Sequence, residues 1–373
     1  MSSPSGTSYD VIVVGARAAG AATAMLLAES GRRVLVVDRS HYGMDTLSTH
    51  ALMRGAVTQL HRWDLLGPVI DKNTPPVRRT TFRYADDEIS IPVKPLHGVD
   101  ALYAPRRTVL DPILVDAAAG AGAEVRYGVA VTGVRRNNRG RVNGIVGRDE
   151  RGKGVHLDAD LVIGADGVRS TIAQRVGAPV VRQGENAGAM VYGYWHGLET
   201  TGFEWFFRRA GVAGLIPTND GQTCVFVGAS RDRVGSGGPQ VLTSILREAW
   251  PDVADRVAAA VAPPGVRTFT GIPGVMRRPF GPGWALVGDA GYWKDPVSAH
   301  GLTDALRDAE LLARAVIADA LPDYQHERDR LSISLFDTTD RITSLEWSDA
   351  EIPALLLQLS EAMTVEVDAL ANL

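Results

Sequence analysis

The chain has 373 residues, of which 45% are hydrophobic and 22% are charged, a composition typical of a soluble globular protein. This length accommodates two domains of ordinary size, about 100–200 residues each. The net charge of -4 at pH 7 argues against a nucleic-acid partner and against a membrane-surface partner. A single cysteine, Cys224, excludes an internal disulfide and fits a reducing cytoplasm, and the first residues lack the pattern of a signal peptide.

The start of the chain predicts a strand, a tight turn, a helix and a second strand. Residues 9–14 form an apolar, β-branched run typical of a buried strand, and residues 21–29 are rich in alanine and leucine, which favour a helix. Residues 15–20 supply the turn, and residues 33–37 the second strand. The apolar stretch 11–28 is interrupted by an arginine and two glycines, so we expect these elements and not a membrane span.

The next part of the chain mixes helices with short strands. Helical patterns cover residues 53–63 and 109–121, and a buried strand ends at Gly164. Two hairpins are expected, the first over residues 80–92 with Asp86-Asp87 at its tip, and the second from strands at 124–134 and 142–148.

From about residue 180 to residue 270 the pattern changes to alternating strands that are rich in aromatic residues. We expect an antiparallel sheet with a covering helix, forming a separate substrate lobe. The strands are expected at residues 190–198, 203–207, 214–217 and 224–229, and the helix at about 240–262. A strand at 285–287 then returns to the first lobe, and the segments 302–320 and beyond 323 are helical.

Gly15-Ala-Arg-Ala-Ala-Gly20 stands where a dinucleotide-binding fold carries G-x-G-x-x-G. In such a turn the helix N-terminus directs amides and a positive dipole toward a pyrophosphate. Asp38 ends the second strand at about the offset where a carboxylate accepts a bond from a ribose hydroxyl. Arg17 replaces the middle glycine and offers a cation beside the phosphates. An ordinary strand–turn–helix without a ligand is the alternative for this motif taken alone.

Gly164-Ala-Asp-Gly-Val-Arg-Ser170 is a more specific signal, although Asp-Gly alone is a common turn. With the first motif, it resembles the flavin-binding fold of p-hydroxybenzoate hydroxylase and its relatives, the single-component FAD monooxygenases. In that family such a segment lies near the cofactor's pyrophosphate and is implicated in NAD(P)H use, and Asp166, Gly167, Arg169 and Ser170 match it.

Gly288-Asp-Ala-Gly-Tyr-Trp-Lys-Asp-Pro296, followed by Gly301, is a third match to the same family. The resemblance implies that Asp289 binds the ribityl chain of FAD and that the backbone from Pro296 to Gly301 runs beside the flavin ring. Ala299 and Thr303 depart from the family, in which many members have glycine and asparagine at these positions.

A fourth resemblance is Arg107-Thr-Val-Leu-Asp-Pro-Ile-Leu114, whose arginine usually contacts FAD in the family, with Arg106 as the competing candidate. A surface arginine at a helix start is the alternative for either. The resemblance assigns cofactor binding to Gly15, Arg17, Ala18, Ala19, Gly20, Asp38, Arg39, Arg107, Val131, Asp166, Gly167, Gly288, Asp289, Pro296, Gly301 and Leu302.

The fold implied by the resemblance is α/β, with an FAD-binding Rossmann-type lobe, an antiparallel-sheet substrate lobe and C-terminal helices. We expect residues 1–78, 106–178 and 272–321 in the FAD lobe, residues 79–105 and 179–271 in the substrate lobe, and residues 322–373 in the C-terminal helices.

The resemblance also implies a reaction. In the family, NADPH or NADH reduces FAD, O₂ adds to give a flavin hydroperoxide, and oxygen passes to the substrate. We therefore expect a monooxygenase that hydroxylates or epoxidises a small aromatic or polyketide-like molecule, as a monomer or a homodimer. The scattered histidines and the single cysteine give no metal-binding pattern.

Three residues are candidates for catalysis. His50 ends the polar loop Asp45-Thr-Leu-Ser-Thr-His50 and has a tunable protonation, although a helix-capping loop is the alternative. Tyr194 would share one sheet face with Tyr192, as substrate floor or as packed core. His300 precedes Gly301 and would lie near the flavin.

Two other flavoenzyme families share the first and third motifs, and the Asp295-Pro296 pair is closer to theirs. They are the flavin-dependent halogenases and the reductases of isoprenoid double bonds, which include geranylgeranyl reductases. The halogenase signature W-x-W-x-I-P is missing, since only Leu215-Ile-Pro217 matches its end. No long apolar groove for an isoprenoid is evident in the sequence. A non-catalytic flavin-binding protein is the third alternative.

Overall fold

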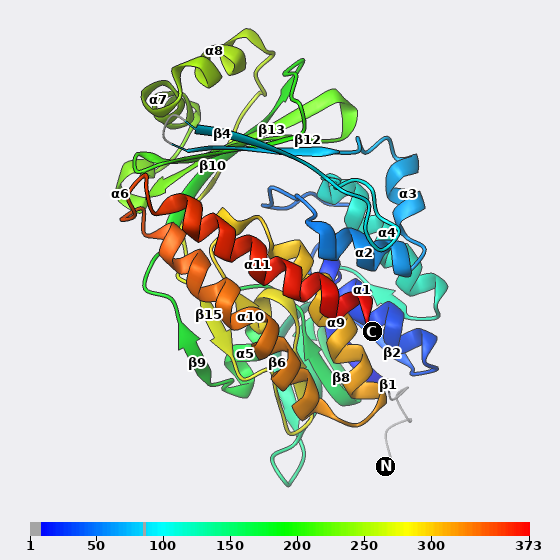
Figure 1. Cartoon of the computed structure of the whole chain (residues 1–373). Coiled ribbons are helices and arrows are strands. Elements are labelled where there is room, and N and C mark those ends of the chain that lie inside the picture. The colour runs from blue at the N-terminus through cyan, green and yellow to red at the C-terminus, as the bar shows by residue number, and fades with distance from the viewer. Residues whose placement is uncertain (1–8, 85–86) are drawn as a thin grey trace.

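The computed structural model describes residues 9–84 and 87–373 and contains two large sheets with helices between and around them (Figure 1). One sheet has eight strands and the other seven, and a small sheet of three strands links them along the chain. The mixed α/β class expected from the sequence is confirmed.

The eight-stranded sheet, called here the cofactor sheet, has a parallel centre in the order β17–β8–β1–β2–β5. The side chains of β1 are buried on both faces, which explains its continuous apolar sequence. Val11 and Val13 pack toward α1 (Ala18–Glu29), while Ile12 and Val14 pack toward the opposite face. The strands are β1 (Tyr9–Val14), β2 (Val34–Val37), β5 (Glu124–Arg126), β6 (Ala130–Arg136), β7 (Val142–Arg148), β8 (Gly154–Gly164), β16 (Phe280–Gly281) and β17 (Trp284–Leu286).

The seven-stranded sheet, called here the substrate sheet, has the order β14–β10–β13–β12–β11–β3–β4 and is antiparallel except for the pair β3–β11. Its far face is covered by α7 (Pro239–Ala249) and α8 (Pro251–Ala259), where Trp250 packs on Phe206 (Figure 1). The strands are β3 (Arg79–Tyr84), β4 (Asp87–Pro92), β10 (Gly188–His196), β11 (Phe203–Arg208), β12 (Gly211–Pro217), β13 (Gln222–Ser230) and β14 (Arg267–Phe269).

The near face of the substrate sheet belongs to the same core as the cofactor sheet. Tyr192 and Tyr194 on β10 are in that core, whereas their neighbours Val191 and Trp195 face α7 and α8. The alternation predicted for this strand is therefore observed for both tyrosines. His196, at the end of β10, is exposed.

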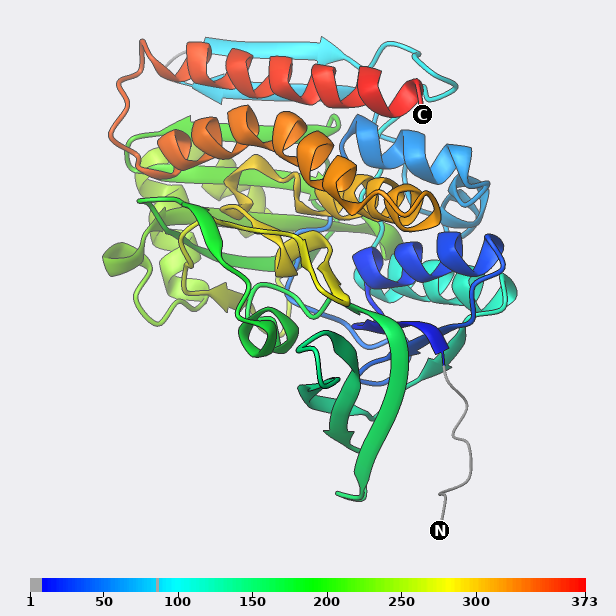
Figure 2. The same ribbon diagram turned by 90° about the horizontal axis from the view of Figure 1, so that it is seen from below.

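Helices cover the remaining faces, and Figure 2 shows α10 (Leu321–Thr343) and α11 (Ile352–Ala371) side by side. α9 (Gly301–Ile317) packs against α1 and α10. No helix within the described residues has the length and apolarity that crossing a membrane requires. The remaining elements are α2 (Arg54–Arg62), α3 (Leu66–Asp71), α4 (Arg107–Gly120), α5 (Thr171–Val176), α6 (Arg231–Val234), and the small sheet of β9 (Val180–Gln183), β15 (Val275–Arg277) and β18 (Tyr292–Trp293).

Two sequence predictions about local structure are wrong. The single helix expected at about 240–262 is broken at Trp250, because Pro251 lacks the N–H that would continue it and starts α8 instead. The strand expected over 124–134 is two strands, of which β5 extends the parallel sheet and only β6 pairs with β7. The first hairpin is confirmed as β3–β4, while Asp86 at its expected tip lies outside the described residues.

Replacement of Trp250 tests the packing of α7 and α8 on the substrate sheet. Trp250 is 2% exposed, so Trp250→Ala should lower the free energy of unfolding by about 3–5 kcal/mol. Ile89→Ala is the control, because Ile89 on β4 is 45% exposed and its truncation should cost less than about 0.5 kcal/mol. Equal losses in urea unfolding would contradict this account of the packing.

Candidate cofactor and substrate site

Three turns that are far apart in the sequence meet at the carboxyl edge of the parallel strands. β1 pairs with β8 through Val14 and Gly164, and β8 pairs with β17 through Gly164 and Leu286. The glycine-rich turns that follow these strands therefore lie side by side. This edge is where open α/β sheets bind their ligands.

Glycines allow these turns to approach one another. A β carbon on Gly15, whose φ is +110°, would lie 2.3 Å from the carbonyl oxygen of Ala165. A β carbon on Gly20 would lie 1.9 Å from the carbonyl oxygen of Gly15, and one on Gly288 would lie 2.8 Å from the side chain of Ala19. The first and third motifs thus touch through residues that leave no room for a side chain.

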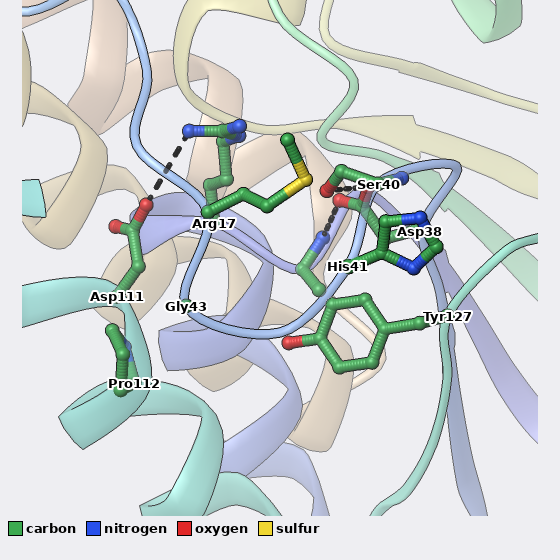
Figure 3. Close-up of a pocket in the computed structure, with 10 residues that line it drawn as sticks. Arg17, Asp38, Ser40, His41, Gly43, Asp111, Pro112 and Tyr127 are labelled. Carbon is green, nitrogen blue, oxygen red and sulfur yellow. Dashed lines mark hydrogen bonds and ion pairs between the residues drawn. The ribbon is translucent and has the colours of Figure 1, made fainter. Parts of the chain in front are cut away.

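A shallow hollow that is open to solvent lies beside the first turn (Figure 3). Asp38 lies in it, and its carboxylate accepts hydrogen bonds from the backbone N–H of Ala16 at 2.7 Å and from the hydroxyl of Ser40 at 2.6 Å. These bonds fix the turn, and the ribose role of Asp38 stays a prediction. The hollow is lined by Ala16, Arg17, Asp38, Ser40, His41, Gly43, Met44, Asp111, Pro112 and Tyr127.

Two arginines share one carboxylate at the same place. Arg107, the first residue of α4, donates from Nε and Nη2 to the two oxygens of Asp111 at 2.9 and 3.0 Å. Arg17 Nη1 lies 3.6 Å from Asp111 Oδ2 and has no hydrogen-bond partner among the described residues (Figure 3). Two guanidinium groups face this one carboxylate, and Asp38 is a second carboxylate in the same hollow.

The N-terminus of α1, beside Arg17, is open to an anion. α1 begins after Arg17 without a side-chain cap, and its first turn carries no acidic residue. Uncapped amides, the helix dipole and an arginine nitrogen without a partner together form the donor set that a pyrophosphate requires. The residues present therefore fit FAD at this edge of the sheet.

The Asp-Gly turn has a local structural role. Asp166 accepts a hydrogen bond from the Ser170 hydroxyl at 2.5 Å and from the backbone N–H of Thr171 at 2.7 Å, at the start of α5. Burial raises the pKa of Asp166 despite these bonds. Gly167 has φ +81°, which only a glycine adopts without strain. The expected contact of Asp166 and Gly167 with FAD stays a prediction. Their turn follows β8, beside the turn that follows β1.

Asp289 follows β17 and is available to a ligand. Burial raises its pKa to about 6, and its carboxylate accepts no hydrogen bond from the described residues. The loop after it is anchored by Asp295, which accepts bonds from the N–H of Val297 at 3.0 Å and of Gly188 at 2.9 Å. Because Gly188 begins β10, this anchor joins the expected flavin loop to the substrate sheet.

The other predicted cofactor residues surround these elements. Arg39 is exposed on the loop after β2, and Val131 is half-buried on β6. Val129 donates its N–H to the carbonyl oxygen of Asp38, which brings the start of β6 to the same loop. Ala18 and Ala19 open α1, Pro296 opens the turn Pro296–Ser298, and Gly301 and Leu302 open α9.

On the substrate sheet, His50 and Tyr194 form a hydrogen-bonded pair. His50 Nδ1 lies 3.1 Å from the carbonyl oxygen of Ala104, which only accepts, so Nδ1 carries the proton. Nε2 of the neutral ring then accepts from the Tyr194 hydroxyl at 3.1 Å. Burial lowers the pKa of His50 to about 3, so the ring stays neutral. His50 also has φ 49°, a strained backbone that is more common at functional sites.

His300 belongs to a different group, which is buried under α9. It precedes α9, and its Nε2 bonds to Glu366 of α11, so the expected flavin loop is tied to the C-terminal helix. Burial alone would raise the pKa of Glu366, but His300 and Arg307 outweigh it and lower the pKa to about 2. Lys294, paired with Asp304, completes the group, and burial lowers its pKa to about 7. His50 and His300 are therefore in separate networks.

His300, Asp304 and Glu366 also place ligand atoms within 4.8 Å of one another, as a metal site does. The same carboxylates already face two cations, since Arg307 Nη1 lies 3.1 Å from Asp304 and 3.6 Å from Glu366, and Lys294 pairs with Asp304. A metal ion would add further positive charge to this group. The charges therefore favour a buried ion-pair network.

Sequence reasoning missed several of these partners. Asp111 follows Arg107 by four residues, the spacing of one helix face, so this pair was detectable. Glu366 and Arg267 carried no motif, and only the fold brings them to the site. Asp45 was expected only as part of a polar loop, whereas its carboxylate accepts hydrogen bonds from Arg106 at 3.0 Å and from Arg267 at 2.8 Å.

Comparison with known proteins gives a family and several relatives. The family model described as FAD binding domain matches residues 8–331. The chain is 28% identical over 343 residues to menaquinone reductase of Mycolicibacterium smegmatis, covering 85% of this chain and 78% of that protein. It is 26% identical to digeranylgeranylglycerophospholipid reductase 1 of Methanococcoides burtonii, covering 84% and 75%.

Solved structures resemble this fold closely. The flavin-dependent brominase Bmp2 has a TM-score of 0.80 at 16% identity, covering 94% of this chain and 93% of that chain. PqsL of Pseudomonas aeruginosa, described as a probable FAD-dependent monooxygenase, has a TM-score of 0.74 at 19% identity, covering 96% and 100%. At these identities the likeness establishes the fold.

Replacement of Asp289 tests the cofactor cradle. Asp289→Ala removes the one carboxylate on the third turn that the described residues leave without a hydrogen bond, so FAD affinity should fall roughly tenfold or more. Flavin retained after dialysis measures the effect. Asp71→Ala, an exposed position on α3, is the matched control. A variant that keeps its full flavin content would remove Asp289 from the site.

The buried pair makes stability depend on pH. Unfolded His50 titrates near pH 6.5 and folded His50 at about 3, so unfolding takes up a proton between these values. The free energy of unfolding should therefore fall with decreasing pH, by up to about 1.4 kcal/mol per unit. His50→Gln should lose this part of the slope between pH 4 and 6.5, whereas His326→Gln, exposed on α10, should keep it. Identical slopes for all three proteins would contradict the neutral, buried assignment.

Proposed function

The chain belongs to the FAD binding domain family, and from that premise we propose that this FAD-dependent oxidoreductase is an NAD(P)H-dependent monooxygenase acting on a small aromatic or polyketide-like molecule. FAD, when bound, supplies the redox chemistry. The residues of the chain then have to bind the substrate, orient it and exclude water.

The observation that carries the proposal is the polar and aromatic near face of the substrate sheet. The rings of Tyr192 and Tyr194 meet edge to face, with their centroids 5.9 Å apart. The His50 ring stacks on the Tyr194 ring, with a centroid distance of 5.6 Å. Phenol and imidazole groups offer hydrogen bonds and ring contacts to an oxygen-bearing aromatic molecule. An unfunctionalised isoprenoid chain offers no acceptor for the hydroxyl proton of Tyr192, whose oxygen accepts a hydrogen bond from the N–H of Ser48.

The direction of the hydrogen bonds gives each residue a role. Tyr194 donates to His50, so the lone pairs of its hydroxyl remain to accept from a substrate hydroxyl. Tyr192 accepts from the N–H of Ser48 at 2.9 Å, and its own proton is free to be donated. We infer that the two tyrosines orient one oxygen of the substrate, while the neutral His50 ring accepts the hydrogen bond of Tyr194 and fixes its direction.

A second candidate is the reduction of an isoprenoid double bond. It is favoured by the two reductases described above, which match more than four fifths of this chain. A halogenase is less favoured, because the tryptophans of its signature are missing before Leu215-Ile-Pro217.

Mixing of the flavin-loaded protein with NADPH or NADH without oxygen, followed by oxygen, separates these functions. A monooxygenase should bleach the flavin faster with a small aromatic compound present and should then incorporate oxygen from ¹⁸O₂ into that compound. Bleaching that is reversed by an isoprenoid quinone, without incorporation, would favour the reductase. No bleaching with either nucleotide would contradict a self-sufficient monooxygenase and favour an enzyme supplied by a separate flavin reductase.

A further inference from the structure

One buried group of charges holds both ends of the loop of residues 294–300, between β18 and α9. Lys294 begins this loop and pairs with Asp304 of α9, while His300 ends it and bonds through Nε2 to Glu366 of α11. These four side chains are at most 5% exposed. The group is called here the α9 cluster and consists of Lys294, His300, Asp304, Arg307, Asp308 and Glu366.

The α9 cluster adjoins the third glycine-rich turn. α9 packs on this turn, Gly288–Ala290, where a β carbon on Gly288 would lie 3.8 Å from that of Ala305. Burial raises the pKa of Asp289 to about 6, and the Lys294 ammonium is the charge that most strongly opposes this rise. A change of charge at the cofactor edge therefore acts on the cluster as well.

The α9 cluster carries a net negative charge when its histidine is neutral. Its carboxylates belong to Asp304, Asp308 and Glu366. Its cations are Lys294 and Arg307, so the charges sum to -1. A nitrogen of the imidazole lies within 4.8 Å of oxygens of two of these carboxylates, and nearby negative charge favours a protonated ring.

The elements packed around α9 bring no further cation to His300 within the described residues. The charges that act on it most strongly are those of Glu366, Lys294 and Arg307. α1 has no charged residue before Glu29, and the arginines of α2 and α10 that lie near α9 bond to other groups. These bonds run from Arg62 to the carbonyl oxygen of Leu370 and from Arg328 to Asp329.

His300 has one nitrogen at which a proton can be added. The pKa of Glu366 is about 2, so its carboxylate is charged and accepts a hydrogen bond from Nε2–H. Nδ1 then keeps a lone pair, and it is buried without a hydrogen-bond partner among the described residues. Burial lowers the pKa of His300 below its usual 6.5, so the ring is neutral at pH 7.

We propose that His300 is a redox-linked proton site, which takes up a proton at Nδ1 when bound FAD is reduced. Transfer of a hydride, which is two electrons and one proton, leaves one new negative charge on the flavin. This charge adds to that of the α9 cluster and of Asp289, and it raises the pKa of the ring. The proton comes from solvent and returns there when the flavin is oxidised again, so no further reactant is needed.

Glu366 is the positioning residue of this site. Its carboxylate determines which nitrogen of His300 keeps its proton and which one receives a second. The inference goes beyond the proposed function, because any reaction that reduces FAD would involve this site.

Counting protons during reduction tests the proposal without a substrate. The flavin-loaded protein is reduced without oxygen at about pH 7 by mediated electrolysis, and an indicator dye in weak buffer reports proton uptake. The protein should take up about two protons per flavin, and His300→Gln about one. His326→Gln, exposed on α10, is the matched control and should keep about two.

Two further measurements separate this role from a merely structural one. Glu366→Gln keeps an acceptor for Nε2 but removes the charge, so the pH above which the second proton is lost should fall by about one unit or more. In the unmodified chain with isotope-labelled histidine rings, reduction should produce the infrared band of a protonated imidazole, which needs no variant.

Several outcomes would overturn the proton site. They are uptake of about one proton by the unmodified protein, a reduced-flavin spectrum that places the second proton on the flavin, and absence of the imidazole band. A second proton that persists in His300→Gln would assign it to another group, such as Lys294. If the proton count holds but no oxygen enters any compound, the proton site stands and the monooxygenase proposal fails.

Discussion

The close approach of three backbone turns determines the rest of this structure. Gly15 lies against the backbone of Ala165, and Gly288 lies against Ala19, at distances that exclude any side chain. Because these contacts fix where β1, β8 and β17 end relative to one another, they also fix the N-terminus of α1 and the carboxylate of Asp289. This steric constraint positions the first and third turns, whereas Arg107, Arg39 and Val131 come from other elements.

The charges are arranged around that edge in two similar units. Arg17 and Arg107 share Asp111, and Arg106 and Arg267 share Asp45. Two consecutive arginines at the start of α4 thus face different carboxylates, one on the cofactor side and one on the substrate side. In each unit two guanidinium groups face one carboxylate, and the outer arginine of each, Arg17 or Arg267, is partly exposed. We expect the first unit to face the pyrophosphate of FAD.

The sequence predicted the positions of the three glycine-rich turns because each of them is local, and the contacts of their residues with FAD stay a prediction. Each glycine-rich turn directly follows an apolar strand, and parallel strands place such turns at one edge, so position along the chain implies position in space. The alternation of β10 likewise placed Tyr192 and Tyr194 on one face. Partners such as Arg267 depend on which strands become neighbours in the substrate sheet, and no periodicity encodes that order. The prediction of one helix over 240–262 was wrong because Pro251 ends α7 and starts α8.

The link between His300 and Glu366 shows why the C-terminal helices matter to a site that lies in the two sheets. His300 stands at the end of the expected flavin loop, and its ring bonds to a carboxylate on α11. Arg307 of α9 faces the same carboxylate at 3.6 Å, farther away than its partners Asp308 at 2.7 Å and Asp304 at 3.1 Å. Loss of α11 would remove the hydrogen-bond partner of the buried His300 ring, and a buried polar group left unsatisfied costs about 1–3 kcal/mol. The geometry of the flavin loop therefore depends on the C-terminal helix, although that helix carries no sequence motif of its own.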